Sequence, residues 1–509
     1  MAVYGIDFGT CNSCIAVAED ENNITVVPSS SSQNTTPSIV MFNIGRNGKP
    51  VVGETAKRAI NTPNSNHVVA FIKTEMGNEL TLREYKISLD EERNLSPIEP
   101  AACIYYELFN YANTFRSNIG LASSNNAVIT VPANCSEIQR EQTKIAAQLA
   151  GINVLQVINE PTAAAISYNI SVGETIMVFD LGGGTLDVSV ITRLSEQNYK
   201  VLSTCGDPNL GGRDWDRNLM SLCYENLGLS FSDDIVTPKD LLLFEGFKKD
   251  ICSKAESAYV TFVDNEGLQH QTFVEIEEFQ QNSVHLVERA MKVVDDAIHS
   301  ASDSVDSLNI SCVCLAGGAS NMPIIKQSLQ QHLPGIPVKI CDPDLAIAKG
   351  AAKYALALSS ENVNYDIIID ERGHSYGLVT YNHNSTIIVD NIILNSDPIE
   401  ISGRTITRYM SRTGDKLKIK IIESNISDLQ YPYREEPACF SDDIVFPEKL
   451  KIGTRVDLSL SRDADGIVYI NTTYGSNKSS GNIKFATKIS SVSEELKERV
   501  STHLSKMNS

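Results

Sequence analysis

Two segments of the chain share the same order of residue types. Each has an apolar run, an aspartate, a turn containing Gly and Thr, and then a second apolar run. These segments are Val3-Tyr4-Gly5-Ile6-Asp7-Phe8-Gly9-Thr10 and Met177-Val178-Phe179-Asp180-Leu181-Gly182-Gly183-Gly184-Thr185. Such a run, turn and run predicts a β-hairpin. Two similar hairpins far apart in one chain predict two similar lobes that face one cleft.

Both turns have the composition of a phosphate-binding loop. Glycine tolerates positive φ and leaves backbone N–H groups unobstructed, and such groups bind phosphate oxygens. Two turns could hold a polyphosphate from both sides, and Asp7 and Asp180 are suited to the hydration shell of Mg²⁺. A purely structural hairpin is the alternative for each turn. The candidate phosphate-binding residues are Gly9, Thr10, Cys11, Asn12, Gly182, Gly183, Gly184 and Thr185.

Two further glycine pairs fit the same cleft. Gly211-Gly212 lies between Asp207 and Asp214, and Gly317-Gly318 follows the apolar run that ends at Ala316. The second pair predicts a strand, a turn and a helix that opens near Pro323, whose N-terminus favours a phosphate or ribose neighbour. Either pair could also be a tight turn with no ligand.

The pattern along the chain predicts two kinds of domain. Residues 1–355 alternate strand and helix patterns, as in an α/β fold. From 364 to 488, short runs such as Thr386 to Leu394 and Leu417 to Ile422 alternate with turns, which predicts an antiparallel β domain. A last amphipathic helix is expected from Ser493 to Lys506. At roughly 150 residues per domain, 509 residues suggest about three folding units.

Composition excludes several classes of protein. The hydrophobic fraction of 42% is sufficient for buried cores and argues against a disordered chain. A net charge of −20 argues against nucleic acid as an obligate partner, because phosphate binding needs a basic face. Without a recognisable secretion signal or membrane-spanning apolar stretch, we expect a cytoplasmic protein that does not bind membranes.

The 11 cysteines are too dilute for a disulfide scaffold and show no zinc-type spacing. We therefore expect reduced thiols. Cys11 and Cys14 form a C-x-x-C without a second pair, and we interpret them as small packing residues rather than a metal or redox site.

Several longer motifs occur in the order found in the DnaK-type heat shock protein 70 family, which the chain resembles densely to about Leu358 and more faintly afterwards. The motifs are Phe8-Gly9-Thr10-Cys11-Asn12-Ser13-Cys14, Thr35-Thr36-Pro37-Ser38, Val131-Pro132-Ala133, Ile158-Asn159-Glu160-Pro161-Thr162-Ala163-Ala164-Ala165, Asp180-Leu181-Gly182-Gly183-Gly184-Thr185-Leu186-Asp187, Leu210-Gly211-Gly212-Arg213-Asp214 and Ala316-Gly317-Gly318-Ala319-Ser320-Asn321-Met322-Pro323.

The resemblance implies a fold and a set of domains. The expected fold class is α/β: a two-lobed actin-like ATPase domain, then an antiparallel β-sandwich and one short C-terminal helix. The expected limits are 1–362 for the ATPase domain, 363–371 for an interdomain linker, 372–489 for the substrate-binding sandwich and 490–509 for the helix.

The resemblance also implies catalytic residues. Lys73 matches the lysine that positions the attacking water and offsets phosphoryl charge, and Glu160 matches the carboxylate beside that water. Without the resemblance, Lys73 would be interpreted as an ordinary solvated lysine. Residues that match the phosphate and metal lining are Thr10, Asp180, Thr185 and Asp187.

Further residues match binding and coupling positions of the family. Pro132 and Arg140 match a pair that relays the nucleotide state towards the linker, whose apolar part is Ile367, Ile368 and Ile369 with Asp370. The residues expected around the nucleoside are Glu245, Lys248, Lys249, Gly318, Asn321 and Asp344. The implied cofactors are ATP or ADP and Mg²⁺, with K⁺ as a further candidate.

Four positions depart from the family pattern. Cys11 replaces a threonine hydroxyl with a weakly hydrogen-bonding thiol, and Asn321 and Lys249 each replace an arginine. Losing a guanidinium plane removes a stacking contact that lysine cannot imitate, so we expect looser nucleotide binding. Gln156 stands where many members have an arginine used by J-domain partners.

The β domain resembles a peptide-binding sandwich. Leu417, Ile419 and Ile421 are candidates for its groove, with ordinary alternation in a half-buried strand as the alternative. The family's long helical lid is replaced here by one short helix, which predicts fast exchange of bound peptide.

The expected function is an ATP-hydrolysing chaperone whose sandwich binds unfolded or extended polypeptide, with a J-domain co-chaperone and a nucleotide exchange factor as implied partners. The alternatives are a nucleotide-gated peptide-binding module with little hydrolysis, a small-molecule kinase on the same lobed fold, and an actin-like filament.

Overall fold

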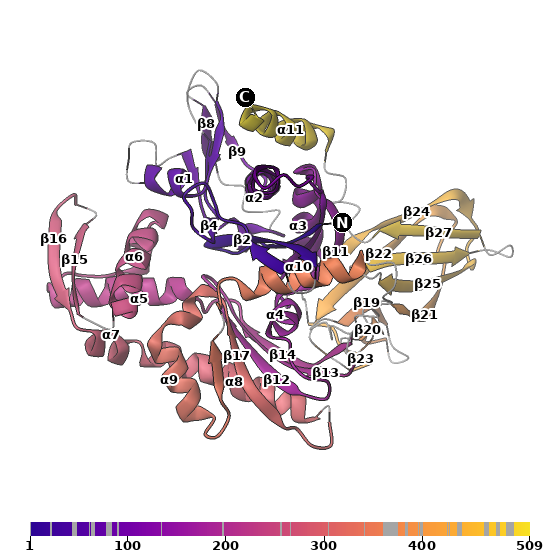
Figure 1. The fold of residues 1–509 in the computed structure, drawn as a ribbon. Helices are drawn as coiled ribbons and strands as arrows, with labels where there is room; N and C mark the ends of the chain where they lie inside the picture. The colour runs from indigo at the N-terminus through magenta and orange to yellow at the C-terminus, as the bar shows by residue number, and fades with distance from the viewer. Residues whose placement is uncertain are drawn as a thin grey trace. The chain divides into compact units, whose positions relative to one another are not determined.

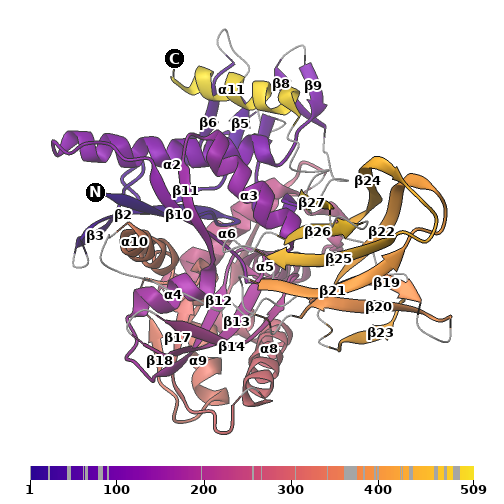
Figure 2. The same ribbon diagram turned by 90° about the vertical axis from the view of Figure 1, so that its right-hand side faces the viewer.

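The computed structural model of the chain has two compact units (Figures 1 and 2). The α/β unit comprises Met1–Pro132, Thr143–Asp366 and Glu494–Ser509, and the β unit comprises Ala133–Gln142 and Ile367–Ser493. The structure describes residues 2–20, 23–42, 48–60, 62, 67–77, 84–88, 91–133, 135–195, 198–254, 257–264, 266–303, 305–340, 342–359, 375–381, 385–394, 397, 401–424, 426, 428–434, 440–462, 468–474, 479–484 and 493–508.

The first sheet of the α/β unit has the order β11-β10-β1-β2-β3, with β4 paired to β2. β1 and β2 form the predicted antiparallel hairpin, whereas β1, β10 and β11 run parallel, so the sheet is mixed. Its strands are β1 (Val3–Asp7), β2 (Asn12–Asp20), β3 (Asn23–Val26), β4 (Thr36–Pro37), β10 (Asn126–Val131) and β11 (Asn153–Asn159).

The second sheet repeats this plan with the order β14-β13-β12-β17-β18. β12 and β13 form the second predicted hairpin, and β12 and β17 run parallel. The strands are β12 (Thr175–Leu181), β13 (Leu186–Arg193), β14 (Tyr199–Asp207), β17 (Ile310–Ala316) and β18 (Val338–Ile340). The prediction of two similar hairpins is therefore confirmed, each in its own sheet.

Helix α10 (Ala346–Leu358) packs against β1 of the first sheet and against α4 (Glu160–Tyr168) (Figure 1). The approach is close enough to require glycine. A Cβ atom on Gly350 would lie 1.7 Å from the carbonyl oxygen of Ala163, and one on Gly5 would lie 2.0 Å from the backbone nitrogen of Ala352. These glycines let α10 lie directly on its neighbours.

Smaller elements extend the first half of the α/β unit. Phe71, with φ of +61°, packs with Leu241 and Leu242 in an apolar cluster that joins this region to helix α6 (Pro238–Lys254). The elements are β5 (Val40–Phe42), β6 (Pro50–Val52), α1 (Glu54–Ala59), β7 (Val68–Val69), the 3₁₀-helix η2 (Ile72–Glu75), β8 (Glu84–Ser88), β9 (Glu91–Asn94) and α2 (Ile98–Asn118).

A large core covers one face of the second sheet, where Phe179 from β12 and Val294 from α8 belong to the same cluster as Trp215. Trp215 lies one turn into α5 and is fully buried. The remaining elements of this half are α5 (Gly212–Asn226), η3 (Asp233–Ile235), α6 (Pro238–Lys254), β15 (Ala258–Val263), β16 (Gln269–Val274), α7 (Ile276–Asn282), α8 (Val284–Asp303), η4 (Gly318–Asn321) and α9 (Pro323–His332).

The β unit contains two antiparallel sheets whose orders are β23-β20-β19-β22-β24 and β21-β25-β26-β27. One buried cluster takes side chains from both, such as Ile421 from β22 and Leu458 from β25. The strands are β19 (Ser375–Tyr381), β20 (Ile387–Ile393), β21 (Ile401–Tyr409), β22 (Gly414–Ser424), β23 (Gln430–Pro432), β24 (Phe440–Leu450), β25 (Arg455–Arg462), β26 (Val468–Tyr474) and β27 (Ser479–Lys484). Helix α3 (Glu137–Leu149) contains the boundary between the units.

The last helix, α11 (Glu494–Asn508), belongs to the α/β unit and lies against α2 (Figure 2). Glu99 of α2 is fully buried there. Its carboxylate lies 3.4 Å from a guanidinium nitrogen of Arg499 and 3.2 Å from Nε2 of His503. The His503 ring also packs on Phe42, with 4.9 Å between ring centroids. Apolar side chains at helical spacing, Leu496, Val500, Leu504 and Met507, are buried.

The predicted fold class is confirmed: a mixed α/β region, an antiparallel sandwich and a C-terminal helix. The predicted linker at 363–371, with Ile367, Ile368, Ile369 and Asp370, lies outside the described residues. No helix in the described part of the chain is both long and apolar enough to cross a lipid bilayer.

Candidate functional site

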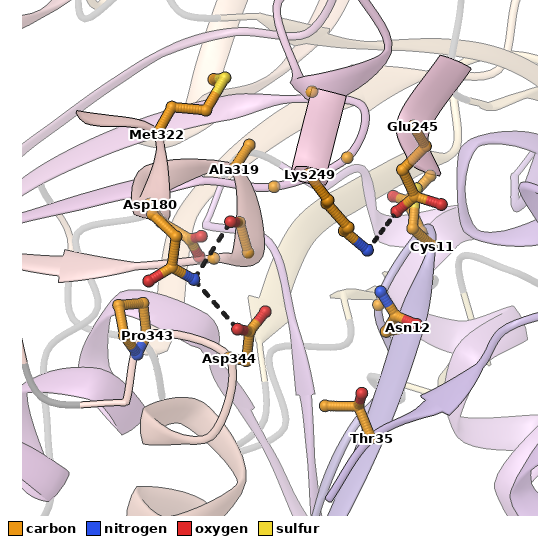
Figure 3. A pocket seen from close by; sticks show the side chains of 18 of the residues that line it. Cys11, Asn12, Thr35, Asp180, Glu245, Lys249, Ala319, Met322, Pro343 and Asp344 are labelled. Atoms are coloured by element: carbon orange, nitrogen blue, oxygen red, sulfur yellow. Dashed lines mark hydrogen bonds and ion pairs between the residues drawn. The ribbon is translucent and has the colours of Figure 1, made fainter. Parts of the chain in front are cut away.

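A cavity of about 390 Å³ lies in the α/β unit, where the ends of β1 and β12 meet the start of α4 and one side of α6. Figure 3 shows part of its lining. The lining residues are Asp7, Gly9, Thr10, Cys11, Asn12, Thr35, Lys73, Glu160, Asp180, Gly182, Gly183, Thr185, Gly212, Asp216, Glu245, Lys248, Lys249, Cys252, Ser253, Gly317, Gly318, Ala319, Asn321, Met322, Pro343, Asp344 and Ile347.

The two predicted glycine turns meet at this cavity. A Cβ atom on Gly183 would lie 2.3 Å from Sγ of Cys11, so the turn after β12 touches the turn after β1. In the first turn, a Cβ on Gly9 would lie 2.0 Å from the carbonyl oxygen of Asn12. The absence of side chains at Gly9 and Gly183 thus allows both turns to close tightly and to face one space.

Lys73 and Glu160 form an ion pair inside the cavity. The Lys73 Nζ lies 2.5 Å from Oε1 of Glu160, and their side chains are 16% and 7% exposed. Burial lowers the pKa of Lys73, but the carboxylates of Glu160 and Asp7 outweigh this effect and leave the pKa raised. Lys73 is therefore a fixed positive charge beside the phosphate-type turns.

Two aspartates project from the strand ends. Burial, together with the neighbouring Glu160 carboxylate, raises the pKa of Asp7 to about 7. Burial also raises the pKa of Asp180 well above its ordinary value, with Glu160 and Asp187 adding to the effect. Asp187 is the cross-strand partner of Asp180 and is not a lining residue. A cation between Asp7 and Asp180 would offset this crowding of carboxylates, so the pair fits a divalent ion.

The opposite part of the cavity is lined by α6. Glu245 accepts hydrogen bonds from Lys249 at 2.7 Å and from Lys57 of α1 at 3.0 Å, and Figure 3 shows the first of these. Burial alone would raise the pKa of Glu245, but Lys249 and Lys57 lower it to about 2. Lys248 Nζ donates to the carbonyl oxygen of Gly212 at 2.6 Å and pairs with Asp216 at 2.7 Å.

Asn321 and Asp344 lie together at the edge of the cavity. The Asn321 amide nitrogen donates to Asp344 Oδ2 at 3.0 Å and to the carbonyl oxygen of Gly318 at 3.2 Å. The amide therefore organises this corner, at the place where the family pattern suggested an arginine. Pro343 precedes Asp344 along the same wall (Figure 3).

Two of the predicted glycines, Gly184 and Gly211, do not line the cavity but lie behind its lining. A Cβ atom on Gly211 would lie 2.5 Å from the backbone of Gly184, so these glycines pack on each other behind the phosphate-type turn. Gly317 has φ of +76°, and a Cβ there would lie 2.4 Å from the carbonyl oxygen of Leu181. Gly212, Gly317 and Gly318 line the cavity.

Cys11 contributes a neutral thiol to the cavity. Burial raises the pKa of its thiol to about 12, and the carboxylates of Glu245 and Asp216 act in the same direction. Cys14 is buried in β2, as expected for a packing residue. Both cysteines are free thiols.

Sequence reasoning missed several lining residues, and Asp216 is the most important of them. Its carboxylate pairs with Lys248, and burial raises its pKa to about 6. The signal was present, because Asp216 follows Gly212 by four residues and lies on the same face of the helix that Gly212 opens. The other missed residues are Thr35, Cys252, Ser253, Ala319, Met322, Pro343 and Ile347.

The predicted coupling and groove residues lie elsewhere. Pro132 follows β10 and is half-buried, and Arg140 is 1% exposed in α3. In the β unit, Leu417 lines a separate cavity. Ile419 and Ile421 are buried in the core of the sandwich, as the alternation in a half-buried strand would place them.

Comparison with known proteins identifies the family. The family model described as "Hsp70 protein" matches residues 3–509. The chaperone protein DnaK of Mycoplasma mobile is 29% identical over 513 residues, covering 98% of this chain and 80% of the relative.

Two other chaperone proteins DnaK match shorter regions. The protein of Mycoplasmopsis synoviae is 33% identical over 361 residues, which cover 69% of this chain and 57% of the relative. The protein of Mycoplasmopsis agalactiae is 32% identical over 391 residues, which cover 74% of this chain and 62% of the relative. With its family match extending along nearly the whole sequence, the chain belongs to the heat shock protein 70 family.

Proposed function

We propose that this protein is an ATP-dependent molecular chaperone, which hydrolyses ATP to ADP and thereby switches the affinity of its sandwich for apolar peptide segments. The observation that carries the proposal is the buried Lys73–Glu160 ion pair in the cavity between two glycine turns. Membership of the family supports chaperone function and nucleotide binding.

Hydrolysis of a phosphoanhydride depends on positioning and on electrostatic stabilisation more than on covalent chemistry. In our proposal the Lys73 ammonium group offsets negative charge on the phosphoryl oxygens and positions the attacking water. Glu160, which already holds Lys73, orients that water and accepts its proton. Thr10 and Thr185 supply hydroxyls to the phosphates.

Asp7 and Asp180 are the residues proposed to hold Mg²⁺, through its water ligands. Their buried carboxylates and raised pKa values suit a divalent cation. When bound, Mg²⁺ supplies charge neutralisation at the phosphate oxygens. Asp187 supports Asp180 from the neighbouring strand, and K⁺ is a further candidate ion for this carboxylate-rich cavity.

The α6 side of the cavity is proposed to hold the nucleoside. Glu245 has its two oxygens fixed by Lys57 and Lys249, and so presents a rigid surface. Asn321 and Asp344 form the other wall, and no guanidinium plane is present at position 321 for stacking. We expect nucleotide to bind more loosely than in a member with arginine there.

The β unit is proposed to bind unfolded or extended polypeptide, with the ATPase domain at 1–362, the linker at 363–371, the sandwich at 372–489 and the terminal helix at 490–509. Pro132, Arg140 and the linker residues Ile367 to Asp370 are the proposed coupling residues. Coupling requires ATP and peptide to favour different arrangements of the chain. A J-domain co-chaperone and a nucleotide exchange factor are the proposed partners.

Single-turnover hydrolysis tests the proposal. Wild type with Mg²⁺ and a trace of labelled ATP should release phosphate, and Lys73→Ala should slow this release by at least about 100-fold, as expected when a charge-stabilising group is removed. Lys292→Ala, at an exposed position of α8, is the control and should keep the wild-type rate.

Other results would identify the alternatives. An equal absence of phosphate release in wild type and Lys73→Ala, with ATP still bound, would favour a nucleotide-gated binding module. Transfer of the labelled phosphate to a metabolite in place of water would favour a small-molecule kinase.

A further inference from the structure

The segment that carries Lys73 begins at a residue with an unusual backbone conformation. Phe71 has φ of +61° and ψ of +31° and directly precedes the 3₁₀-helix η2, which contains Lys73. The Phe71 carbonyl oxygen accepts two hydrogen bonds from Thr74, one from its backbone N–H at 3.2 Å and one from its hydroxyl at 2.8 Å. A left-handed conformation is unfavourable for a residue with a Cβ atom, so contacts with other parts of the chain must hold Phe71 in place.

Arg213 supplies one of these contacts. Its guanidinium carbon lies over the Phe71 ring, 4.9 Å from the ring centroid. The aromatic face attracts a cation in this position, and the planar guanidinium group can also stack on the ring. Arg213 is half-buried and is the second residue of α5. The contact therefore joins the start of α5 to the segment that carries Lys73.

The same arginine contacts the glycine turn that follows β12. Its backbone N–H and its Nε both donate to the carbonyl oxygen of Gly183, at 3.0 and 3.3 Å. A Cβ atom on Gly184 would lie 2.7 Å from Nη2 of Arg213 and 3.2 Å from Cγ2 of Thr74. The absence of a side chain at Gly184 thus leaves room for both neighbours. This glycine turn and the segment that carries Lys73 meet at Arg213.

We infer that Arg213 is a positioning residue for Lys73. Its contacts with Phe71 and with the glycine turn after β12 fix η2, and with it the Lys73 ammonium group, relative to that turn. Arg213 is not among the residues that line the cavity, so it acts through Lys73 and not by touching the nucleotide. The inference rests on the proposed ATP hydrolysis and adds a residue to it. A misplacement of about 1 Å can slow a reaction by about 100-fold, and we expect an effect of about tenfold here.

Phosphate release in a single turnover tests this inference. Arg213→Met keeps most of the side-chain length without the guanidinium group, and Arg213→Lys keeps the charge without the planar group that stacks. With Mg²⁺ and the full chain in excess over labelled ATP, both variants should release phosphate about tenfold more slowly than wild type. The dissociation constant of ATP, measured by rapid filter binding, should change less than about twofold, because Arg213 does not touch the nucleotide.

Combination with Lys73→Ala shows whether Arg213 acts through the lysine. In the Lys73→Ala background, Arg213→Met should lower the remaining rate by less than about twofold, because the group that it positions is already absent. A general role in the folded state would instead lower the rate by the same factor in both backgrounds. Labelled phosphate makes this slow release measurable from a small converted fraction.

Two further variants serve as partner and as control. Phe71→Leu removes the stacked ring and should lower the rate by a similar factor, and adding Arg213→Met to it should have little further effect. Arg217→Met removes an arginine one turn later in α5, which pairs with Asp214 at 3.3 Å and whose side chain is 42% exposed. This control should keep the wild-type rate. Thermal unfolding of each variant verifies that it is folded.

The outcomes separate the inference from the function on which it rests. If wild type releases no phosphate, the proposed hydrolysis fails and the inference fails with it. If wild type hydrolyses ATP but either Arg213→Met or Arg213→Lys keeps its rate, the inference is overturned and the proposed function remains. The same holds if the loss lies entirely in ATP affinity, or if it is equally large in the Lys73→Ala background.

Discussion

The carboxylate of Glu245 lies between the ammonium groups of Lys57 and Lys249, at 3.0 and 2.7 Å. These two cations lower its pKa from 4.5 to about 2 although burial acts in the opposite direction. Lys57 belongs to α1 and Lys249 to α6, so the carboxylate links two helices that are far apart in the sequence.

This depressed pKa predicts an acid-dependent loss of stability. A carboxylate whose pKa is lower in the folded state stabilises fully above its unfolded pKa, and this stabilisation is lost as the pH falls through the folded value. Here the window is from about 4.5 down to about 2, and the shift corresponds to roughly 3 kcal/mol at most. The difference in unfolding free energy between wild type and Glu245→Gln should therefore be constant near pH 7 and shrink below pH 4.5.

Urea unfolding of both proteins at a series of pH values measures this difference. Lys57→Gln removes one of the two cations and so makes the folded pKa of Glu245 less depressed. Its stability relative to Glu245→Gln should therefore begin to fall at the same pH, near 4.5, but the loss should be smaller and should end at a higher pH. A difference that stays constant down to pH 2.5 would contradict the assignment of the pKa shift to these ion pairs.

Individual site residues differed in how far the sequence could predict them. Local motifs were sufficient to predict that Asp7 and Asp180 each lie beside a glycine turn. Each aspartate and its turn belong to the same hairpin, and their spacing in the sequence determines how close they are. The contact between Lys73 and Glu160 joins residues 87 positions apart and depended on the family resemblance. Asp216 was missed because its role depends on Lys248, and only the folded α5 and α6 bring these two together.

At the scale of elements, the packing of α10 depends on glycine. A Cβ atom on Gly350 would meet the carbonyl oxygen of Ala163 at 1.7 Å, and this neighbour is backbone of α4 that cannot rotate away. Gly246 of α6 has free space around it, since a Cβ atom there would meet no other atom within 4 Å.

The same substitution at these two helix positions should therefore have opposite effects. Gly350→Ala should destabilise the α/β unit by about 3 kcal/mol or more, because α10 or α4 must shift. Gly246→Ala should stabilise by about 0.5–1 kcal/mol through the lower entropy of the unfolded chain. Thermal unfolding of both variants measures the effects, and equal shifts in the same direction would contradict the packing described here.

Elements were predicted well where the pattern was local. The helix that begins at Pro323, the strand within 386–394 and the C-terminal helix all formed close to their expected limits. The hairpin motifs predicted the antiparallel pairs, but the parallel pairing of β1 with β10 and of β12 with β17 was not predicted, because an apolar run does not show which distant strand lies beside it. The contact of α11 with α2 also needed the structure, since Glu99 and His503 lie 404 residues apart.

At the scale of the whole molecule, the proposed coupling can be followed with Trp215. It is the single tryptophan of the chain, and it lies fully buried in α5, directly before the cavity residue Asp216. ATP binding should change its fluorescence through the α5 N-terminus, and a peptide added afterwards should reverse part of the change if the two ligands favour different arrangements.

The measurement needs only the intrinsic fluorescence of the full chain, first with ATP and then with an unstructured nonapeptide that has a Leu-Ile-Leu centre and three Ser residues on each side. The Trp215→Phe variant, which has no tryptophan, gives the background fluorescence to be subtracted. A response to ATP that peptide leaves unaltered would show nucleotide binding without coupling, contrary to the proposed switch.

The attachment of α11 has a mechanical consequence. Residues on both sides of the sandwich, up to Asp366 and from Glu494, belong to the same compact unit. A force applied between the first strand and residue 508 therefore acts across the α/β unit alone, and the sandwich is shielded from tension until α11 detaches. The Glu99 contacts with Arg499 and His503, together with the buried apolar side chains of α11, hold this helix and must break before any strand of the β unit is stretched.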